Sequence, residues 1–202
     1  MNTRNFLDRQ VAMHEDFADR LMSEERRRIQ DPRLIVDQLP LRPGMVVADL
    51  GCGPGFFTIP IALKVGDAGT VYAVDSSPEM LKRLTRNVKE SRLPENIVRV
   101  VQADVSHTSI PSRSVDLVFF ADILHDLEDR AGFLTEVKRI AKSQGTVVDI
   151  DWQKIETGFG PPLKIRLTEE DSRRIMTTNG FSVTGTVPGG LYHYGLVCTR
   201  GA

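Results

Sequence analysis

Short apolar segments alternate with segments of helical periodicity along most of this chain, and the alternation restricts the folds open to it. Each apolar segment is short and ends in an acidic or turn-forming residue, as buried parallel strands do. We predict such strands over residues 45–50, 70–75, 97–102, 115–120 and 146–150. Because strands and helices alternate, the strands should form an open parallel sheet with helices on both faces.

Two more strand-like segments, residues 182–187 and 193–199, lie near the C-terminal end. The connection between them contains Pro188, Gly189 and Gly190 and has no room for a crossover helix, so the pair should be antiparallel. The predicted fold class is therefore α/β. It is a doubly wound, mostly parallel seven-stranded sheet with an antiparallel last strand.

Helical periodicity also marks the segments outside this core. Residues 7–22 and 33–39 predict two N-terminal helices, and a capping box at Thr168 and Asp171 begins a helix that ends at Asn179. The apolar face of the first helix contains Leu7, Val11, Ala18 and Leu21, with His14 among them. The length suits one domain, residues 1–202. We divide it into N-terminal helices (1–40), a core (41–151) and a C-terminal helix with the strand pair (152–202).

Aspartates follow several of the predicted strands. In an open α/β sheet, ligands bind beyond the carboxyl ends of the strands. These ends carry Asp49, Asp75, Asp104, Asp122 and Asp151. Because a carboxylate is costly to place beside a core, the clustering indicates ligand contacts. The alternative is that these aspartates only cap helices and form turns.

A glycine-rich loop, Gly51-Cys-Gly-Pro-Gly55, directly follows the first predicted strand. Glycines permit a tight turn and a close approach of the backbone to a ligand. Asp75 ends the next strand at a spacing suited to gripping ribose hydroxyls, which also fits a nicotinamide or flavin dinucleotide. However, a dinucleotide needs free amides for its pyrophosphate. Pro54 has no backbone N–H to donate, and Phe56 and Phe57 crowd the position that a pyrophosphate would occupy. The sequence therefore argues against a dinucleotide.

Three segments together resemble a known family. Residues 46–56 (VVADLGCGPGF), 74–81 (VDSSPEML) and 102–105 (QADV) resemble, in order, the first three motifs of class I, Rossmann-like methyltransferases. The resemblance covers roughly residues 40–150 and implies S-adenosylmethionine as the cofactor and S-adenosylhomocysteine as its product. It also implies that the N-terminal helices form a lid, with Phe17 or His14 over the site.

The resemblance further implies which residues hold each part of the cofactor. The loop glycines pass under the methionine moiety, and Asp49 helps to hold its amino group. Asp75 accepts hydrogen bonds from both ribose hydroxyls, Ser76 and Met80 line the adenosine, and Asp104 contacts the adenine amino group. The full expected set is Asp49, Gly51, Cys52, Gly53, Asp75, Ser76, Met80, Asp104, Val105 and Ala121.

The segment after the fourth strand faces the methyl group in this family. Here His125-Asp126 resembles the His-Asp segment of small-molecule O-methyltransferases, in which the histidine deprotonates a hydroxyl. We therefore hypothesise that His125 is a catalytic general base with a carboxylate setting its tautomer. The alternative is that His125 packs on the cofactor or caps the next helix. Residues expected to face the acceptor are Asp122, Asp151 and Trp152, with residues 158–162 forming a loop over the site.

Composition excludes several other classes. The formal net charge of -1 gives no global field to attract nucleic acid, and the basic run Arg26–Arg28 predicts a solvated helix face. Cys52 and Cys198 cannot form a disulfide framework and have no metal-ligand spacing, so we expect no metal. No apolar signal-peptide core or membrane-spanning run is present, and we expect a cytoplasmic protein.

Motifs that this sequence lacks exclude some classes of methyl acceptor. The Asn/Asp-Pro-Pro motif of nucleic-acid amino-group methyltransferases is missing after the fourth strand, and the cysteines that arsenite methyltransferases need are missing too. We therefore expect a small-molecule acceptor, in a subgroup similar to quinone methyltransferases. The alternatives are a macromolecular acceptor, which a basic groove near Lys164 and Arg166 or around Arg26–Arg28 would favour, and a non-catalytic S-adenosylmethionine-binding protein. No feature of the sequence specifies an oligomeric state.

Overall fold

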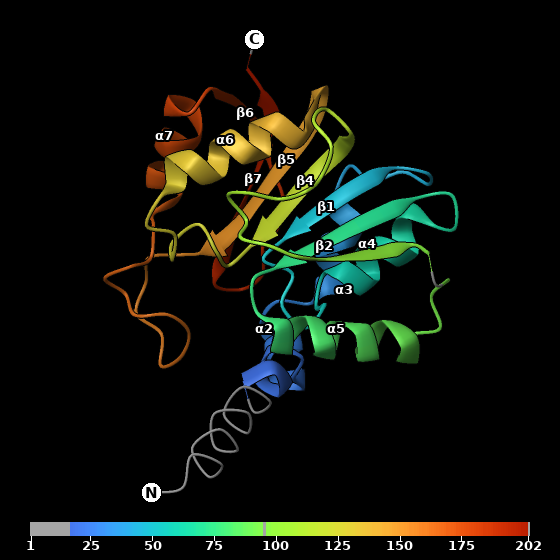
Figure 1. Cartoon of the computed structure of the whole chain (residues 1–202). Coiled ribbons are helices and arrows are strands. Elements are labelled where there is room, and N and C mark those ends of the chain that lie inside the picture. The colour runs from blue at the N-terminus through green and yellow to red at the C-terminus, as the bar shows by residue number, and fades with distance from the viewer. Residues whose placement is uncertain (1–16, 95, 202) are drawn as a thin grey trace, which may run out of the picture.

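A seven-stranded sheet forms the centre of the molecule in the computed structural model, which describes residues 17–94 and 96–201 (Figure 1). The strand order is β3-β2-β1-β4-β5-β7-β6. The strands are β1 (Val46–Leu50), β2 (Thr70–Asp75), β3 (Val98–Gln102), β4 (Val115–Ala121), β5 (Ala141–Trp152), β6 (Phe181–Thr186) and β7 (His193–Arg200). β3, β2, β1, β4 and β5 pair in parallel, whereas β7 pairs antiparallel with both β5 and β6. The predicted fold class is confirmed.

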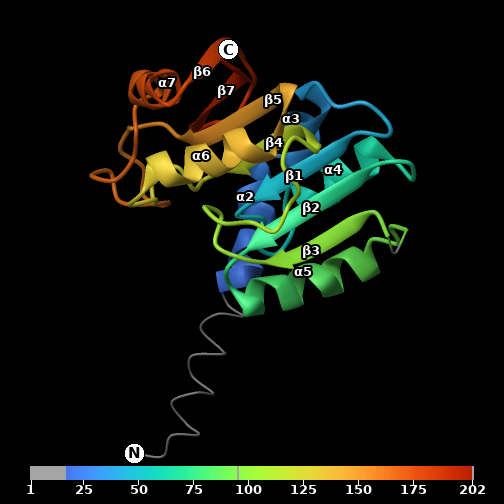
Figure 2. The same ribbon diagram turned by 45° about the horizontal axis from the view of Figure 1, so that its top comes forward.

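Helices cover both faces of the sheet (Figure 2). They are α2 (Glu24–Ile29), α3 (Pro32–Gln38), α4 (Thr58–Val65), α5 (Pro78–Glu90), α6 (Arg130–Ile140) and α7 (Glu169–Thr178). Successive strand residues point to opposite faces, so the sheet divides the apolar core in two. Val47, Val71 and Phe119 pack on the side of α3 and α4, while Val118 and Phe120 pack on the side of α6 and α7.

Local sequence sets most of the helix boundaries. The Ser77 side chain caps α5 by accepting from the Met80 amide, and Pro78 occupies the first helical turn. Thr168 and Asp171 form the predicted capping box of α7. Gly180 follows that helix with a φ of 81°, a conformation that glycine adopts without strain.

The structure differs from the predicted elements in two places. β5 is longer than predicted because the chain passes directly from α6 into the strand, whose pairing with β4 shifts register between Val115 and Leu117. The short helix α2 contains the basic run and was not predicted as a separate element. Residues 17–21 are helical, as expected, while Leu7, Val11 and His14 lie outside the described residues.

Topology brings the functional candidates together. The carboxyl ends of β1, β2, β4 and β5 lie at one edge of the sheet, and the segment from residue 17 to α2 packs beside that edge (Figures 1 and 2). In the described part of the chain, no helix has the combination of length and apolarity needed to cross a membrane.

Candidate active site

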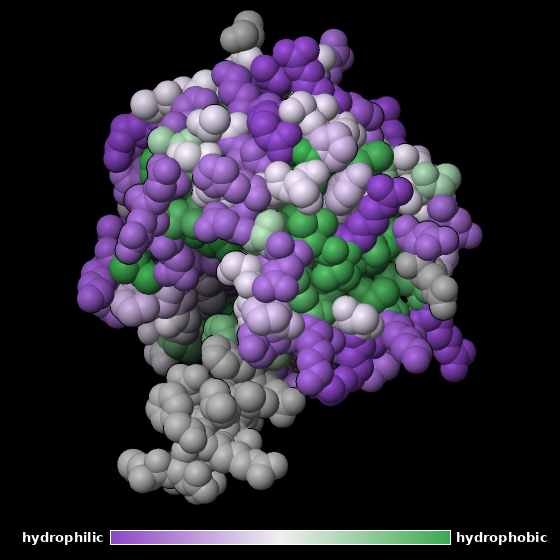
Figure 3. All heavy atoms as spheres, in the orientation of Figure 1, coloured by the Kyte–Doolittle hydropathy of each residue, from purple (hydrophilic) through white to green (hydrophobic). Residues whose placement is uncertain are grey.

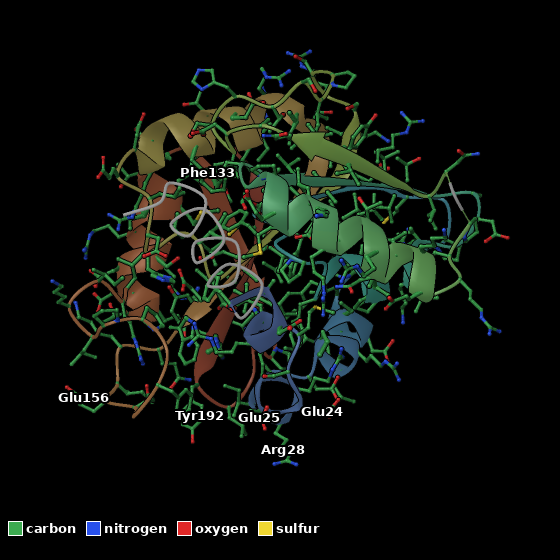
Figure 4. All side chains as sticks on the ribbon, turned by 60° about the horizontal axis from the view of Figure 1, so that its bottom comes forward. Glu24, Glu25, Arg28, Phe133, Glu156 and Tyr192 are labelled. Carbon is green, nitrogen blue, oxygen red and sulfur yellow. The ribbon has the colours of Figure 1, made fainter. Side chains whose placement is uncertain are left out.

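A cavity of about 1230 Å³ opens at the carboxyl edge of the sheet. Its walls come from the glycine loop, the segment from residue 17 to α2, the β4–α6 connection and the loop after β5. Figure 3 shows the surface hollowed beside that last loop. In Figure 4, Glu25 of α2, Tyr192 before β7 and Glu156 of the loop after β5 lie along the same side of the molecule, although they are far apart in sequence.

The glycine loop forms a tight turn at the end of β1. Gly51 has a φ of 72° and Gly53 a φ of 52°, in the left-handed region that favours glycine. A Cβ on Gly51 would lie 2.7 Å from a side-chain carbon of Ile123, so a side chain there would collide with the β4–α6 connection. The turn therefore brings bare backbone to the cavity.

Backbone amides hold the Asp75 carboxylate at the cavity wall. The Gly53 amide donates to one oxygen at 2.8 Å, and the Ser77 amide donates to the other at 2.9 Å. Each carboxylate oxygen can accept more than one hydrogen bond, so both remain able to accept from a ligand. This arrangement fixes an anionic acceptor between the glycine loop and α5.

Asp49 lies under the glycine loop and is 3% exposed. Burial raises the pKa of Asp49 to about 7, against the hydrogen bond that the Thr58 hydroxyl donates at 2.6 Å, and the nearby charge of Asp75 adds to the rise. The Asp49 carboxyl therefore changes charge near neutral pH, at a position that faces the cavity.

His125 and Asp151 form a buried pair at the ends of β4 and β5. The Nδ1 atom of His125 lies 2.6 Å from one Asp151 oxygen, and the His125 amide donates to the other at 3.0 Å. Burial alone would lower the pKa of His125, but the hydrogen bond and the charge of Asp151 more than offset it and raise the pKa. With Nδ1–H directed at the Asp151 carboxylate, Nε2 carries the lone pair of this cavity-lining ring and lies 3.5 Å from a carboxylate oxygen of Asp126.

An ion pair that the sequence did not predict ties α2 to the site. The Arg26 guanidinium donates to Asp122 at 2.8 Å and lies 4.1 Å above the ring of Phe56. Arg26 and Asp122 side chains are only 17% and 16% exposed. The prediction that the basic run is simply a solvated helix face is therefore wrong for Arg26. Its partner is distant in sequence and could not be identified from spacing.

The expected site residues fall into three groups. Those that line the cavity are Phe17, Asp49, Gly51, Cys52, Gly53, Asp75, Met80, Ala121, Asp122, His125 and Trp152, together with residues 159–162 of the expected loop. Ser76 is exposed outside the cavity lining, where its neighbour Ser77 lies instead. Asp104 and Val105 also lie outside the lining, and the Asp104 side chain accepts from the Ser106 amide at 2.7 Å.

The third group lies behind the wall. Asp151 is fully buried, so it faces His125 and not the open cavity. Arg166, considered above as part of a basic groove, is 2% exposed and donates to loop carbonyls. Sequence reasoning missed the cavity-lining side chains Phe56, Phe57, Ile123 and Asp126. Within the described residues, no cluster of three or more His, Cys, Asp or Glu side chains is arranged to hold a metal ion.

Comparisons with known proteins agree on one family. A family model described as "Methyltransferase domain" matches residues 48–149, half of the chain. A demethylmenaquinone methyltransferase from Desulfitobacterium hafniense is 29% identical over 119 residues, which cover 59% of this chain and 47% of that protein. A ubiquinone/menaquinone biosynthesis C-methyltransferase from Shewanella baltica is 29% identical over 122 residues, covering 60% and 48%. The chain thus spans about half the length of these curated relatives.

A solved structure covers nearly the whole chain. The crystal structure of a SAM-dependent methyltransferase from Aquifex aeolicus superimposes with a TM-score of 0.85 at 30% identity. The match covers 92% of this chain and 97% of the Aquifex chain.

The buried ion pair predicts a measurable loss of stability. Arg26→Ala would leave the Asp122 carboxylate with only the longer contacts to Gln30 Nε2 at 3.4 Å and His193 Nε2 at 3.3 Å, and we expect the free energy of unfolding to fall by about 3 kcal/mol. Arg173→Ala is the matched control, because the Arg173–Glu169 pair is 38% and 46% exposed and should contribute less than about 1 kcal/mol. Urea unfolding at pH 7 measures both variants, and equal losses would contradict a special role for the buried pair.

The raised pKa of Asp49 predicts how stability depends on pH. In the folded state Asp49 keeps its proton up to about pH 7, so its contribution to stability is complete below its ordinary pKa of 3.8 and is lost as the pH rises through 7. Asp49→Asn removes this loss. We expect the variant to gain about 2–4 kcal/mol over the native chain at pH 8 and clearly less at pH 5. A gain that is independent of pH would show that Asp49 is already ionised in the folded protein.

Proposed function

The chain belongs to the class I, Rossmann-like family of S-adenosylmethionine-dependent methyltransferases, and we propose that it transfers a methyl group to an apolar, hydroxylated small molecule. The observation that carries this proposal is that one cavity is lined both by Asp75, whose carboxylate is held by two backbone amides, and by His125, whose ring is oriented by the buried Asp151 carboxylate. The Aquifex protein, which is named for S-adenosylmethionine dependence, supports the cofactor.

The residues present fit S-adenosylmethionine. The glycine loop offers bare backbone that a side chain on Gly51 would obstruct, and Asp75 is held by two amides with acceptor capacity to spare for ribose hydroxyls. Asp49 lies beneath the loop, where its carboxyl suits an amino group of the methionine moiety. When bound, the cofactor supplies a methyl group on a positively charged sulfur. Ser77, Met80 and Cys52 also line this side of the cavity.

The acceptor side lies across β4 from the cofactor side. It combines His125 and Asp126 with the apolar side chains of Ile123, Trp152 and Phe159. A mostly apolar pocket with a few polar groups suits a small hydrophobic ligand whose orientation those groups fix. The relatives named as demethylmenaquinone and ubiquinone/menaquinone methyltransferases support a ring compound of the quinol type.

His125 acts on the acceptor hydroxyl in this proposal. Its Nε2 atom accepts the hydroxyl proton, and the Asp151 carboxylate stabilises the imidazolium that results. The deprotonated oxygen would attack the methyl carbon in line while the methyl–sulfur bond breaks and its electron pair stays on the sulfur, giving neutral S-adenosylhomocysteine. If the charge passes to an ortho or para ring carbon and that carbon attacks instead, it would then lose its ring proton to restore aromaticity. The chemistry at the cofactor needs no acid, so the walls contribute alignment and exclusion of water, an effect that can reach about 7–11 kcal/mol.

The same proposal covers location and partners. Cys52 and Cys198 are buried free thiols, which suits a reducing cytoplasm. Arg166 is buried, the Arg26 side chain is 17% exposed, and both are committed to internal contacts, so neither offers a basic groove for nucleic acid. We therefore favour a small molecule over a macromolecule as the acceptor.

Cofactor binding is the first test. Calorimetric titration with S-adenosylmethionine, S-adenosylhomocysteine and NADH should detect binding of the first two alone. Asp75→Ala should weaken both by about tenfold or more, because it removes charge-assisted hydrogen bonds to ribose worth roughly 1.5–3 kcal/mol each. Asp37→Ala is the matched comparison, since Asp37 pairs with Lys64 outside the cavity lining and should change affinity far less. Binding of NADH alone would refute the proposed cofactor.

The base is tested with an acceptor identified by screening quinols and phenols for S-adenosylhomocysteine release. His125→Ala should lower kcat by about 10²–10⁴-fold while cofactor affinity changes little. Because Asp151 raises the pKa of His125, native kcat should rise with pH through a midpoint above 6.5. Asp151→Asn should move that midpoint to lower pH. Near-native turnover by His125→Ala would remove His125 from catalysis and leave it a packing residue.

A further inference from the structure

Arg166 is a buried arginine whose hydrogen bonds all go to uncharged oxygens. Its residue is 2% exposed, and it lies on the loop between β5 and α7. Burying a guanidinium costs free energy unless its donors are satisfied. The large set of donors on Arg166 therefore requires a specific arrangement of acceptors around it.

The loop itself supplies those acceptors. Nε of Arg166 donates to the Pro161 carbonyl at 2.8 Å, and one terminal nitrogen donates to the Ile155 carbonyl at 2.9 Å. The other terminal nitrogen donates to the Phe159 carbonyl at 2.8 Å and to the Thr157 hydroxyl at 2.7 Å. Four points spread over seven residues of loop are thus tied to one rigid, planar group.

The clamped loop is one wall of the cavity. Phe159, Gly160, Pro161 and Pro162 line it, as does Ile165, next to Arg166 in sequence. The Arg166 guanidinium also lies 4.9 Å above the ring of Trp152, whose other contacts include Phe159 at a centroid distance of 5.9 Å. A Cβ on Gly160 would lie 2.8 Å from the Trp152 ring, so the loop approaches the indole too closely for a side chain there.

Sheet order gives this wall its place in the site. The glycine loop follows β1 and Asp75 ends β2, whereas Trp152 ends β5, on the other side of β4. The clamped loop therefore lies away from the residues proposed to hold the cofactor and beside His125. It thus borders the part of the cavity that the cofactor would leave open, which is the part proposed for the acceptor.

We propose that Arg166 is a positioning residue that fixes residues 155–165 as the acceptor wall, and that this wall, with Trp152, selects a flat apolar ring. The inference rests on the proposed function for the identity of the acceptor side. It assigns acceptor specificity to a side chain that does not itself line the cavity. A lysine cannot replace Arg166, because all the donors of a lysine lie on one nitrogen. The guanidinium has donors on three nitrogens, which reach acceptors on different sides of the planar group.

Arg166→Lys tests the clamp without any substrate. Trp152 is the single tryptophan of the chain, so intrinsic fluorescence reports on this wall alone. We expect Trp152 emission to shift to longer wavelength, its quenching by acrylamide to increase, and amide hydrogen exchange in residues 155–165 to accelerate by about tenfold or more. Arg173→Lys on α7, whose side chain is 38% exposed, is the control and should change none of these. Unchanged fluorescence and exchange in Arg166→Lys would overturn the clamp.

A milder variant covers the case in which Arg166→Lys does not fold. Thr157→Val removes one acceptor of the clamp and keeps the shape of the side chain. It should accelerate exchange in the same segment by a smaller factor, and an unchanged exchange rate there would equally overturn the clamp.

Ligand binding tests the assignment of the wall. With 1-naphthol as the probe and S-adenosylhomocysteine present, Arg166→Lys should weaken naphthol binding by about tenfold while the affinity for S-adenosylhomocysteine stays within about twofold. Equal losses for both ligands, or unchanged naphthol binding by a loosened loop, would overturn the acceptor-wall assignment. No naphthol binding by the native chain would overturn the preference for a flat ring. Failure of the native chain to bind the cofactor would refute the proposed function instead, while the fluorescence and exchange results would still decide the clamp.

Discussion

The structure depends on how it compensates carboxylates that lie at the ends of buried strands. A charge beside a core is costly, and each of these aspartates has its own source of donors. Thr58 donates to Asp49, two backbone amides donate to Asp75, Arg26 pairs with Asp122, and His125 pairs with Asp151. The donors come from α4, the glycine loop, the N-cap of α5, α2 and the β4–α6 connection. Satisfying the strand ends therefore also fixes the segments that enclose the cavity.

The aspartates on the proposed cofactor side and those on the proposed acceptor side have different hydrogen-bond donors. This difference determines the chemistry to which each side is suited. On the cofactor side, the single hydroxyl near Asp49 leaves its pKa raised to about 7, while Asp75 is held by neutral amides. On the acceptor side, Asp151 is paired with a titratable ring, so charge there can move with a proton. One side suits binding of a permanent cation and its sugar, and the other suits proton transfer.

Sequence reasoning succeeded where the information is local. Hydrophobic periodicity and capping residues such as Ser77 and Thr168 set the elements, and the glycine loop and strand-end acids gave the position of the cavity. It failed where a side chain depends on a distant partner. The local sequence of α2 predicts an exposed Arg26. Its pairing with Asp122 can be recognised only in the folded structure, which brings the two residues together. Arg166 likewise has a role only because the loop before it folds back around it, and no pattern in residues 155–165 predicts that path.

The backbone of Asp122 has a φ of 61°, in a region that residues with a Cβ seldom adopt. Aspartate and asparagine tolerate this region better than other such residues, but only aspartate also supplies the charge that Arg26 requires. Glycine would relax the backbone and lose the ion pair, and glutamate would keep the charge but not the turn. One position therefore carries two independent demands that a single residue type meets. Any related sequence that keeps α2 packed beside the carboxyl edge of the sheet through this ion pair should therefore keep aspartate at position 122.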